Sequence, residues 1–182
     1  PPVDGDQANL PDQYFGRGNS ATTCGVILSG NILANAVNTR DVGANAGAGM
    51  VKNLNTLQMY CSIQAAINDV LTLAGHVIEA SAGIYNERVT VSKSLTIQGT
   101  DKANCILDGA SLAGTGKGIL VANGVKGVTI KNLTVQNFAG TNGNTDAGIY
   151  AIGGNDTLTV RNVIVQNNVG GSGFYANGPI NT

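Results

Sequence analysis

Oxygen-bearing side chains are closely spaced near the beginning of the chain. Asp4, Asp6 and Asp12 lie in the segment DGDQANLPD (4–12), together with the amides of Gln7 and Asn9. Calcium is bound by several oxygen ligands supplied from one tight turn, so this spacing is typical of a calcium loop. The simpler interpretation is an acidic terminus without an ion. Calcium is therefore the candidate cofactor, with Asp4, Asp6 and Asp12 as its candidate ligands.

Polar side chains suited to sugar binding recur at a fixed spacing in the second half of the chain. The segments VTIKNLTVQN (128–137) and LTVRNVIVQN (158–167) are near copies, 30 residues apart. Amide and charged groups on a flat surface can hydrogen bond to the hydroxyls of a glycan. The alternative is an ordinary solvated sheet surface. The candidate glycan ligands in the two copies are Lys131 and Arg161, and Gln136 and Gln166.

Two tyrosines repeat in a similar way. Tyr150 lies in GIYA (148–151) and Tyr175 lies in GFYA (173–176). If these segments are neighbouring strands, the two rings stack on the outer face of the sheet, where an aromatic pair offers a flat surface to a sugar. Both tyrosines therefore join the candidate glycan site.

Short β-strands must position these side chains, because apolar and polar residues alternate with a period of two after residue 77. The alternation restarts after an asparagine, which tolerates the left-handed backbone of a tight corner and can pass hydrogen bonds to the next copy. The expected inward residues are Val128, Ile130, Leu133 and Val135 in one copy, and Leu158, Val160, Val163 and Val165 in the next. The expected corner residues are Asn132, Asn162, Asn137 and Asn167.

The strands belong to a longer repeat. GILV (118–121) recurs as GIYA after 30 residues and as GFYA after a further 25. One loop accounts for the difference, because NVGGS (168–172) is shorter than NFAGTNGNTDA (137–147). Repeats of this length stack on one another and share a continuous core. The pattern predicts an all-β fold with three strands and about 25–30 residues per coil.

The first part of the chain follows a different pattern. Residues 1–60 are polar and rich in turn-forming residues, so we expect an irregular N-terminal appendage, followed by the repeat domain at 61–182. The segment SIQAAINDVLTLA (62–74) predicts a short amphipathic helix with Ser62 as its N-cap and Gly75 as its stop. The coils are expected to occupy residues 77–182.

Three cysteines are present, at positions 24, 61 and 105. They show no CxxC spacing, which argues against a zinc site. In a secreted protein, one disulfide and one buried thiol is the simplest arrangement. We favour a Cys24–Cys61 disulfide with Cys105 buried, although the sequence leaves the pairing open.

Composition and charge exclude several functions. The formal net charge is −1 and only 12% of residues are charged, so the basic surface of a nucleic-acid binder is missing. No apolar run is long enough to span a membrane.

Two local features do not indicate a catalytic or nucleotide-binding site. The segment GTGKG (114–118) departs from the phosphate-loop pattern. His76 is the lone histidine and has no nearby nucleophile, which favours a structural role.

The segments YCSIQAAINDV (60–70) and HVIEASAGIYNERVTVSKSLTIQG (76–99) resemble the first coil of pectinesterases and of the secreted bacterial β-helix repeat proteins. From about residue 60 to 182 the chain is similar to the pectin-lyase-like superfamily. This resemblance implies a right-handed parallel β-helix whose first coil is capped by the predicted helix. It also implies a secreted bacterial protein, extracellular or on the cell surface.

The catalytic residues of those enzymes are not matched. The strand alignment places the pectinesterase Gln near Thr145 or Asp146 and its first Asp near Gly170, so neither residue is kept. The second Asp and the Arg would fall beyond Thr182. Pectate lyases cluster several carboxylates around calcium beside a basic residue. The corresponding residue types here are expected on different faces: Asp108, Lys117, Lys131, Asp146, Asp156 and Arg161.

Two functions remain open. The first is a non-catalytic extracellular β-helix module with an adhesive or structural role, whose partner is a polysaccharide or cell-surface glycan. The second is the N-terminal part of a polysaccharide lyase or hydrolase with its active site in later coils. The last segment, GFYANGPINT (173–182), begins a new coil, so we expect an open end with exposed strand edges. Such an end predicts a longer native chain or end-to-end assembly into an oligomer or filament.

Overall fold

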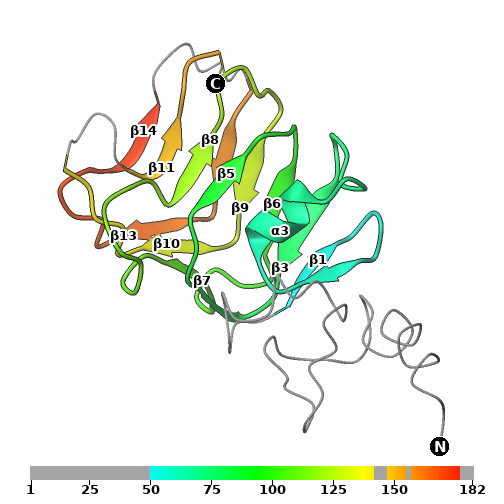
Figure 1. Ribbon diagram of the computed structural model, residues 1–182, viewed down its shortest axis with the longest axis horizontal. Helices are drawn as coiled ribbons and strands as arrows, with labels where there is room; N and C mark the ends of the chain where they lie inside the picture. Colours follow the sequence, from blue (N-terminus) through cyan, green and yellow to red (C-terminus); the bar gives the residue numbers. More distant parts are fainter. Residues whose placement is uncertain (1–49, 142–146, 155–156, 177–182) are drawn as a thin grey trace, which may run out of the picture.

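The computed structural model describes residues 50–141, 147–154 and 157–176 (Figure 1). In these ranges the chain is mostly β-structure, with one short helix and mainly parallel strand pairs. The calcium candidates Asp4, Asp6 and Asp12 lie outside the described residues, as does Cys24.

The strands form three sheets, named A, B and C here. Sheet A contains, in spatial order, β12 (Thr159–Arg161), β9 (Thr129–Lys131), β6 (Thr96–Gly99), β3 (Val77–Ala80), β1 (Val51–Asn53) and β2 (Met59–Tyr60). Sheet B contains β13 (Ile164–Gln166), β10 (Thr134–Gln136), β7 (Cys105–Asp108) and β4 (Gly83–Tyr85). Sheet C contains β14 (Ser172–Ala176), β11 (Ala147–Ala151), β8 (Ile119–Val121) and β5 (Val89–Val91).

The chain visits the three sheets in turn. From β3 onward, three consecutive strands lie in sheets A, B and C, and the next three pair with them in the same order. These pairs are parallel, as for β9 with β12 and β10 with β13. Figure 1 shows the sheet C strands β5, β8, β11 and β14 side by side in sequence order. The fold is therefore β-helix-like, with each passage of the chain adding one layer.

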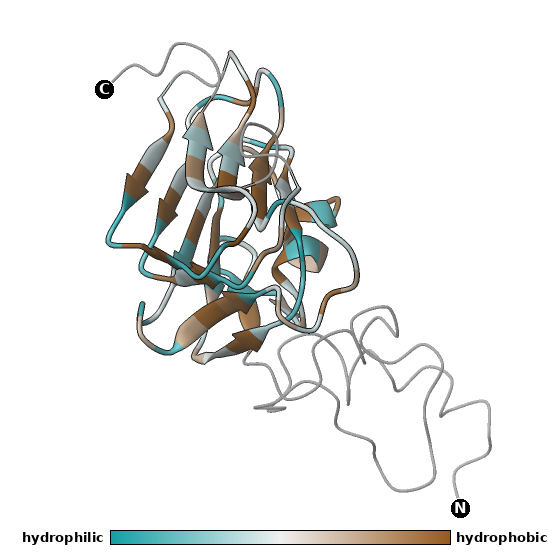
Figure 2. Cartoon of the chain, turned by 90° about the vertical axis from the view of Figure 1, so that its left-hand side faces the viewer, coloured by the Kyte–Doolittle hydropathy of each residue, from teal (hydrophilic) through white to brown (hydrophobic). Residues whose placement is uncertain are grey.

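Inward side chains form continuous apolar rows through the stack. In sheet A, Ile78, Ile97 and Ile130 lie in register and are fully buried. Sheets B and C add the buried rows Tyr85, Leu107 and Val135, and Val91, Val121 and Ala151. Figure 2 shows the corresponding alternation of apolar and polar residues along the strands. The expected inward set of the first copy is confirmed as buried: Val128, Ile130, Leu133 and Val135.

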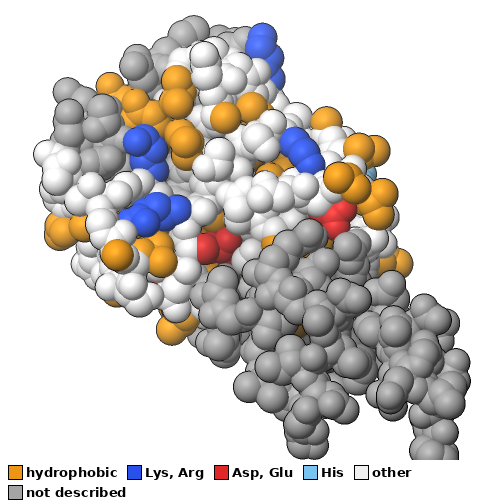
Figure 3. Space-filling model, viewed as in Figure 1, with side chains coloured by type: hydrophobic (Ala, Val, Ile, Leu, Met, Phe, Trp, Pro, Cys, Tyr) orange, Lys and Arg blue, Asp and Glu red, His pale blue; other side chains and the backbone are white. Residues whose placement is uncertain are grey.

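The helix α3 (Ile63–Asn68) is shorter than the predicted helix at 62–74. Ser62 is its N-cap, as expected, and its hydroxyl accepts from the Ala65 amide. The helix ends because Asp69 adopts an extended backbone and its carboxylate accepts from the Leu71 amide at 2.8 Å. The residues beyond it therefore leave the helical face, and Val70 is 85% exposed. Figure 3 shows hydrophobic side chains beside the single histidine at this end.

The end of the predicted N-terminal appendage contains two strands, β1 and β2. β1 pairs antiparallel with both β2 and β3, so β1 and β2 belong to sheet A. Sequence patterns missed this pairing because Val51 lies opposite Ala80, which is remote in the chain. β1, β2 and α3 together cover the N-terminal end of the stack.

One outward position differs from its expected environment. The alternation between the inward residues Leu133 and Val135 directs Thr134 outward, but its side chain is buried. Its hydroxyl donates to the Lys102 carbonyl at 2.6 Å, because the loop after β6 folds over this part of sheet B. The outward row of sheet B is therefore partly covered.

Candidate functional site

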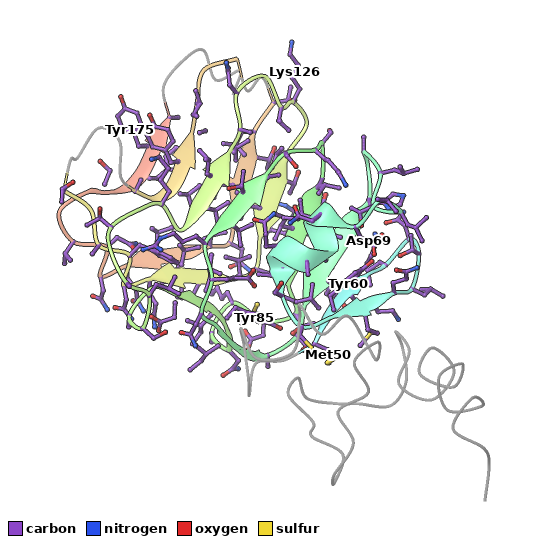
Figure 4. The ribbon with its side chains drawn as sticks, viewed as in Figure 1. Met50, Tyr60, Asp69, Tyr85, Lys126 and Tyr175 are labelled. Carbon is purple, nitrogen blue, oxygen red and sulfur yellow. The ribbon has the colours of Figure 1, made fainter. Side chains whose placement is uncertain are left out.

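Tyr150 and Tyr175 lie opposite each other on β11 and β14 in sheet C. Their ring centroids are 5.1 Å apart and the ring planes differ by 12°, so the rings are stacked. Tyr150 is only 8% exposed, whereas Tyr175 is partly exposed at the outer layer. A planar ligand could therefore contact Tyr175 more readily than Tyr150 (Figure 4).

Lys117 lies beside the tyrosine pair. Its ammonium nitrogen is 4.8 Å from the centroid of the Tyr150 ring, within the range of a cation–π interaction. Figure 3 shows Lys or Arg side chains together with hydrophobic side chains over β11 and β14. In the sequence, GTGKG (114–118) only departs from the phosphate-loop pattern, and nothing in it predicts the contact of Lys117 with Tyr150. The contact depends on the position of the loop before β8, which no local pattern encodes.

Arg88 fixes that loop. Its guanidinium donates to the carbonyls of Ala113 and Gly114, at 3.2 and 2.8 Å. A Cβ on Gly116 would lie 2.9 Å from Arg88 Nε, so glycine allows the backbone to approach the guanidinium. Arg88 therefore holds the loop that carries Lys117. It is a positioning residue that the sequence analysis did not identify.

The cationic candidates lie on a different sheet. Lys131 on β9 and Arg161 on β12 are register partners in sheet A. Gln98 and Glu79 continue the same row toward β3, and Gln98 donates to the Glu79 carboxylate at 2.5 Å. The structure therefore does not bring Lys131 and Arg161 together with the tyrosines of sheet C.

The glutamine candidates form a hydrogen-bonded ladder on sheet B. Gln166 donates to the Gln136 side-chain oxygen at 2.8 Å, and Gln136 donates to Asp108 at 2.8 Å. Asn137 also donates to Asp108, at 3.0 and 3.1 Å. These side-chain amides bond to each other and to the Asp108 carboxylate, so their main role is to stabilise the stack. The predicted glycan residues are thus divided among three sheets.

The four predicted corner asparagines all have positive φ angles. The values are 56° for Asn132, 61° for Asn137, 52° for Asn162 and 54° for Asn167. Asn162 donates to the Asn132 side-chain oxygen at 2.8 Å, which links two successive layers. Asparagine is one of the few residues that accept this backbone conformation at modest cost.

The carboxylates around α3 are engaged in structural hydrogen bonds. Glu87 accepts from the Ile63 and Gln64 amides at 2.8 and 2.9 Å, at the N-terminus of the helix. Asp69 accepts from the Tyr60 hydroxyl at 2.8 Å (Figure 4). In the described ranges, no group of three or more His, Cys, Asp or Glu side chains is arranged to hold a metal ion.

His76 belongs to a small polar cluster at the same end. Its Nδ1 is 3.1 Å from the Asn53 amide nitrogen and 3.3 Å from the Leu73 backbone nitrogen. Asn53 also donates to the Thr72 hydroxyl at 2.9 Å. These contacts join β1 to the segment after α3, which gives the histidine a structural role.

The cysteines differ in state. Cys61 is disulfide-bonded, and Cys105 is a buried free thiol. Because Cys24 lies outside the described residues, the Cys24–Cys61 pairing stays a prediction.

Comparison with known proteins finds a partial sequence relative and a partial structural neighbour. No known family profile matches the chain. A cell surface glycoprotein of Methanothermus fervidus is 38% identical over 109 residues, which cover 50% of this chain and 18% of the glycoprotein. The chain thus spans less than a fifth of this relative.

The structural neighbour is a pectin methylesterase from Yersinia enterocolitica. It is 18% identical, with a TM-score of 0.47, and the match covers 66% of this chain and 48% of the esterase. A similarity of this extent does not indicate the function of this chain. Among the described residues, no helix is long and apolar enough to cross a lipid bilayer.

Proposed function

We propose that the chain is a non-catalytic, surface-associated structural module, built as a right-handed parallel β-helix with three strands per coil. The observation that carries this proposal is the 38% identity to a cell surface glycoprotein over 109 residues. A secreted or extracellular location and a bacterial source are part of the same proposal.

The use of polar side chains supports a structural role. Glu87 and Asp69 hold the ends of α3 and its neighbours, and Asp108 anchors the glutamine ladder of sheet B. These are the most buried carboxylates of the described residues, and each accepts hydrogen bonds from the scaffold itself. Carboxylates engaged in this way stabilise the fold itself rather than act on a substrate.

Two measurements test this proposal. Antibodies raised against the chain should label intact cells of the source organism, and brief protease treatment of those cells should remove the signal. The purified chain should show no turnover of pectins, alginates or glycosaminoglycans, with or without calcium. Turnover that is lost on replacing an outward carboxylate would instead support the lyase or hydrolase interpretation.

A second function, glycan binding at sheet C, is supported by the stacked tyrosines with Lys117 beside them. Stacked rings with a nearby cation offer both an apolar surface and a hydrogen-bond donor to a sugar. The proposed contact residues are Tyr175 and Lys117, because Tyr150 is almost buried. Lys131, Arg161, Gln136 and Gln166 lie on other sheets and are not part of this surface.

Replacing Tyr175 by Ala should weaken binding to any glycan selected from an array by roughly tenfold, since ring contacts of this kind contribute about 0.5–1.5 kcal/mol beyond the buried area. Tyr175→Phe should retain most of the affinity because it keeps the ring. Thr90→Ala, three layers from Tyr175 in the same outward row, is the matched control. Equal affinities for all three variants would show that sheet C is not the binding surface.

A further inference from the structure

Asn132, at the corner between β9 and β10, begins the tripeptide Asn132-Leu133-Thr134. An asparagine followed two residues later by serine or threonine is the acceptor sequence for N-linked glycosylation. The chain contains this sequence twice, and the second asparagine, Asn155, lies outside the described residues. A pattern of three residues often occurs by chance, so a site also requires an accessible side-chain nitrogen.

The side-chain nitrogen of Asn132 is available in the folded chain. Asn132 is half-buried, and its Oδ1 accepts from Asn162 Nδ2 at 2.8 Å, in a hydrogen bond that is exposed to solvent. In the layer below, the corresponding corner residue is Gly99, one place beyond the register pair of Gln98 and Lys131. Glycine has no side chain that could accept from the amide. Among the described residues, Asn132 Nδ2 therefore has no hydrogen-bond acceptor.

The other predicted corner asparagines do not combine a free side-chain nitrogen with an acceptor sequence. Asn162 uses its Nδ2 to donate to Asn132. Asn137 uses its Nδ2 to donate to Asp108. The residues two places after Asn137, Asn162 and Asn167 have no hydroxyl group; they are Ala139, Ile164 and Val169. Asn132 is therefore the corner asparagine whose surroundings fit a modified side chain.

Thr134 is an exception in its own row of sheet B. Its register partners are Ile106 and Ile164, and Ile84 continues the row beyond Ile106. A hydroxyl thus occurs in an otherwise aliphatic row, at the position that the acceptor sequence requires. In the folded chain this hydroxyl is buried and donates to the Lys102 carbonyl at 2.6 Å, so a transferase has no access to it. The sugar must therefore be added before this layer folds.

We propose that Asn132 is an N-glycosylation site, with its sugar at the corner between sheets A and B. The inference rests on the proposed surface location, because transferases that use lipid-linked sugars act on exported chains. In the transfer, the bond between sugar C1 and the phosphate oxygen of the lipid donor breaks and the bond between C1 and Nδ2 forms. One Nδ2 proton is released, and the lipid phosphate leaves. Oδ1 can still accept from Asn162, so the ladder is retained.

Mass spectrometry of the native chain tests this site. The chain is isolated from the source organism and cleaved before aspartate, which releases residues 108–145 with Asn132 in their single acceptor sequence. Fragmentation of this peptide should locate an added sugar mass on Asn132. An unmodified Asn132 would overturn the inference, as would a sugar on Asn137 instead. Antibody labelling of the same intact cells then shows separately whether the proposed surface location holds.

Variants expressed in the source organism separate the acceptor sequence from the corner conformation. Asn132→Asp keeps an oxygen that accepts from Asn162 but removes the amide nitrogen, so the sugar mass should be lost completely. Thr134→Val should also abolish the modification, whereas Thr134→Ser keeps the hydroxyl and should retain it. Asn162→Asp, at the equivalent corner of the next layer, is the matched control and should leave the sugar mass unchanged. A sugar mass that persists in Thr134→Val would contradict the site.

Discussion

Asp108 is a charged residue held almost entirely inside a hydrogen-bond network. It is 8% exposed and accepts from Gln136, Asn137 and the Ala110 amide. Burial alone raises the pKa of this carboxyl, but the three sets of hydrogen bonds outweigh burial and hold the pKa below its ordinary value of 3.8. The charge is therefore part of the scaffold of sheet B, and its ionised form stabilises the fold.

Asp108→Asn should destabilise the chain by about 1–3 kcal/mol at pH 7, because the new amide group faces the donors of Gln136 and Asn137. Since the folded pKa is lowered, the stabilisation by Asp108 is complete above the unfolded pKa and is lost as the pH falls through the folded value. Denaturant unfolding between pH 7 and pH 2 measures both effects. A variant that matches the parent at pH 7 and retains its full acid sensitivity would contradict this account.

Asn132 occupies a corner with a φ of 56°, and it also accepts a hydrogen bond from Asn162. Asn132→Ala should lower the free energy of unfolding by about 1–2 kcal/mol, because alanine disfavours the left-handed backbone. The lost hydrogen bond should lower it further. Asn132→Gly tolerates the backbone and should be the milder change. Comparing the unfolding free energies of the two variants separates backbone strain from the ladder. If Gly were the more harmful change, the corner conformation would not explain the asparagine.

Individual residues were predictable where their environment repeats along the chain. The inward aliphatics and corner asparagines follow from the alternation, because every layer presents the same surroundings. Arg88 and Lys117 were missed because each makes a remote contact that does not repeat. Arg88 donates to a loop 25 residues or more away, and Lys117 lies over the Tyr150 ring. The burial of Thr134 is not predictable from the alternation either, because the loop that carries Lys102 covers this outward position.

At the scale of elements, α3 depends on groups outside itself. A helix of six residues is too short to persist alone in water. Glu87, just before β5, binds its first amides, and Lys93, just after β5, donates to the carbonyls of Ile67, Asp69 and Thr72 at 2.8–3.0 Å. The residues that flank β5 thus supply a negative charge to the helix N-terminus and a positive charge to its C-terminal side, in the favourable sense for the helix dipole.

Lys93→Met should lower the free energy of unfolding by about 1–3 kcal/mol, because three partly buried carbonyls lose their donor. Lys102→Met, at an exposed position, provides a control of the same chemistry and should be nearly neutral. Guanidinium denaturation followed by circular dichroism measures the difference. A change below about 0.5 kcal/mol for Lys93→Met would show that water replaces the ammonium without cost.

The length of α3 could not be predicted because the contacts that end the helix depend on the tertiary structure. The apolar spacing continues to residue 74, but the Asp69 carboxylate and Lys93 capture the backbone groups that would extend the helix. The pairing of β1 with β3 is similarly remote. Elements within the repeat were therefore predictable, whereas those that terminate the stack depend on contacts that occur once.

At the scale of the whole molecule, Cys105 reports on the integrity of the core. It is 1% exposed, and burial, with a smaller contribution from the charge of Asp101, raises its pKa to about 12. The native thiol should therefore resist alkylation, because the thiolate is the reactive form and reagent has no access. Labelling should become rapid only when the stack unfolds.

Timed alkylation in increasing denaturant, followed by mass spectrometry, tests this expectation. Without reductant, one thiol per chain should be labelled after unfolding, as the predicted Cys24–Cys61 disulfide requires. Rapid labelling of Cys105 in native buffer would mean that the core opens locally. Three labelled thiols would contradict the disulfide.

The layered stack also determines how this molecule would respond to a mechanical load. From β3 to β14 the strands pair sideways along one axis, so tension along that axis pulls on the inter-strand hydrogen bonds of one layer at a time. Peeling of this kind meets little resistance compared with shearing many bonds together. Each layer released would add about 30 residues, or roughly 10 nm of extended chain. A stretched molecule would therefore lengthen in small, repeated steps and dissipate force gradually.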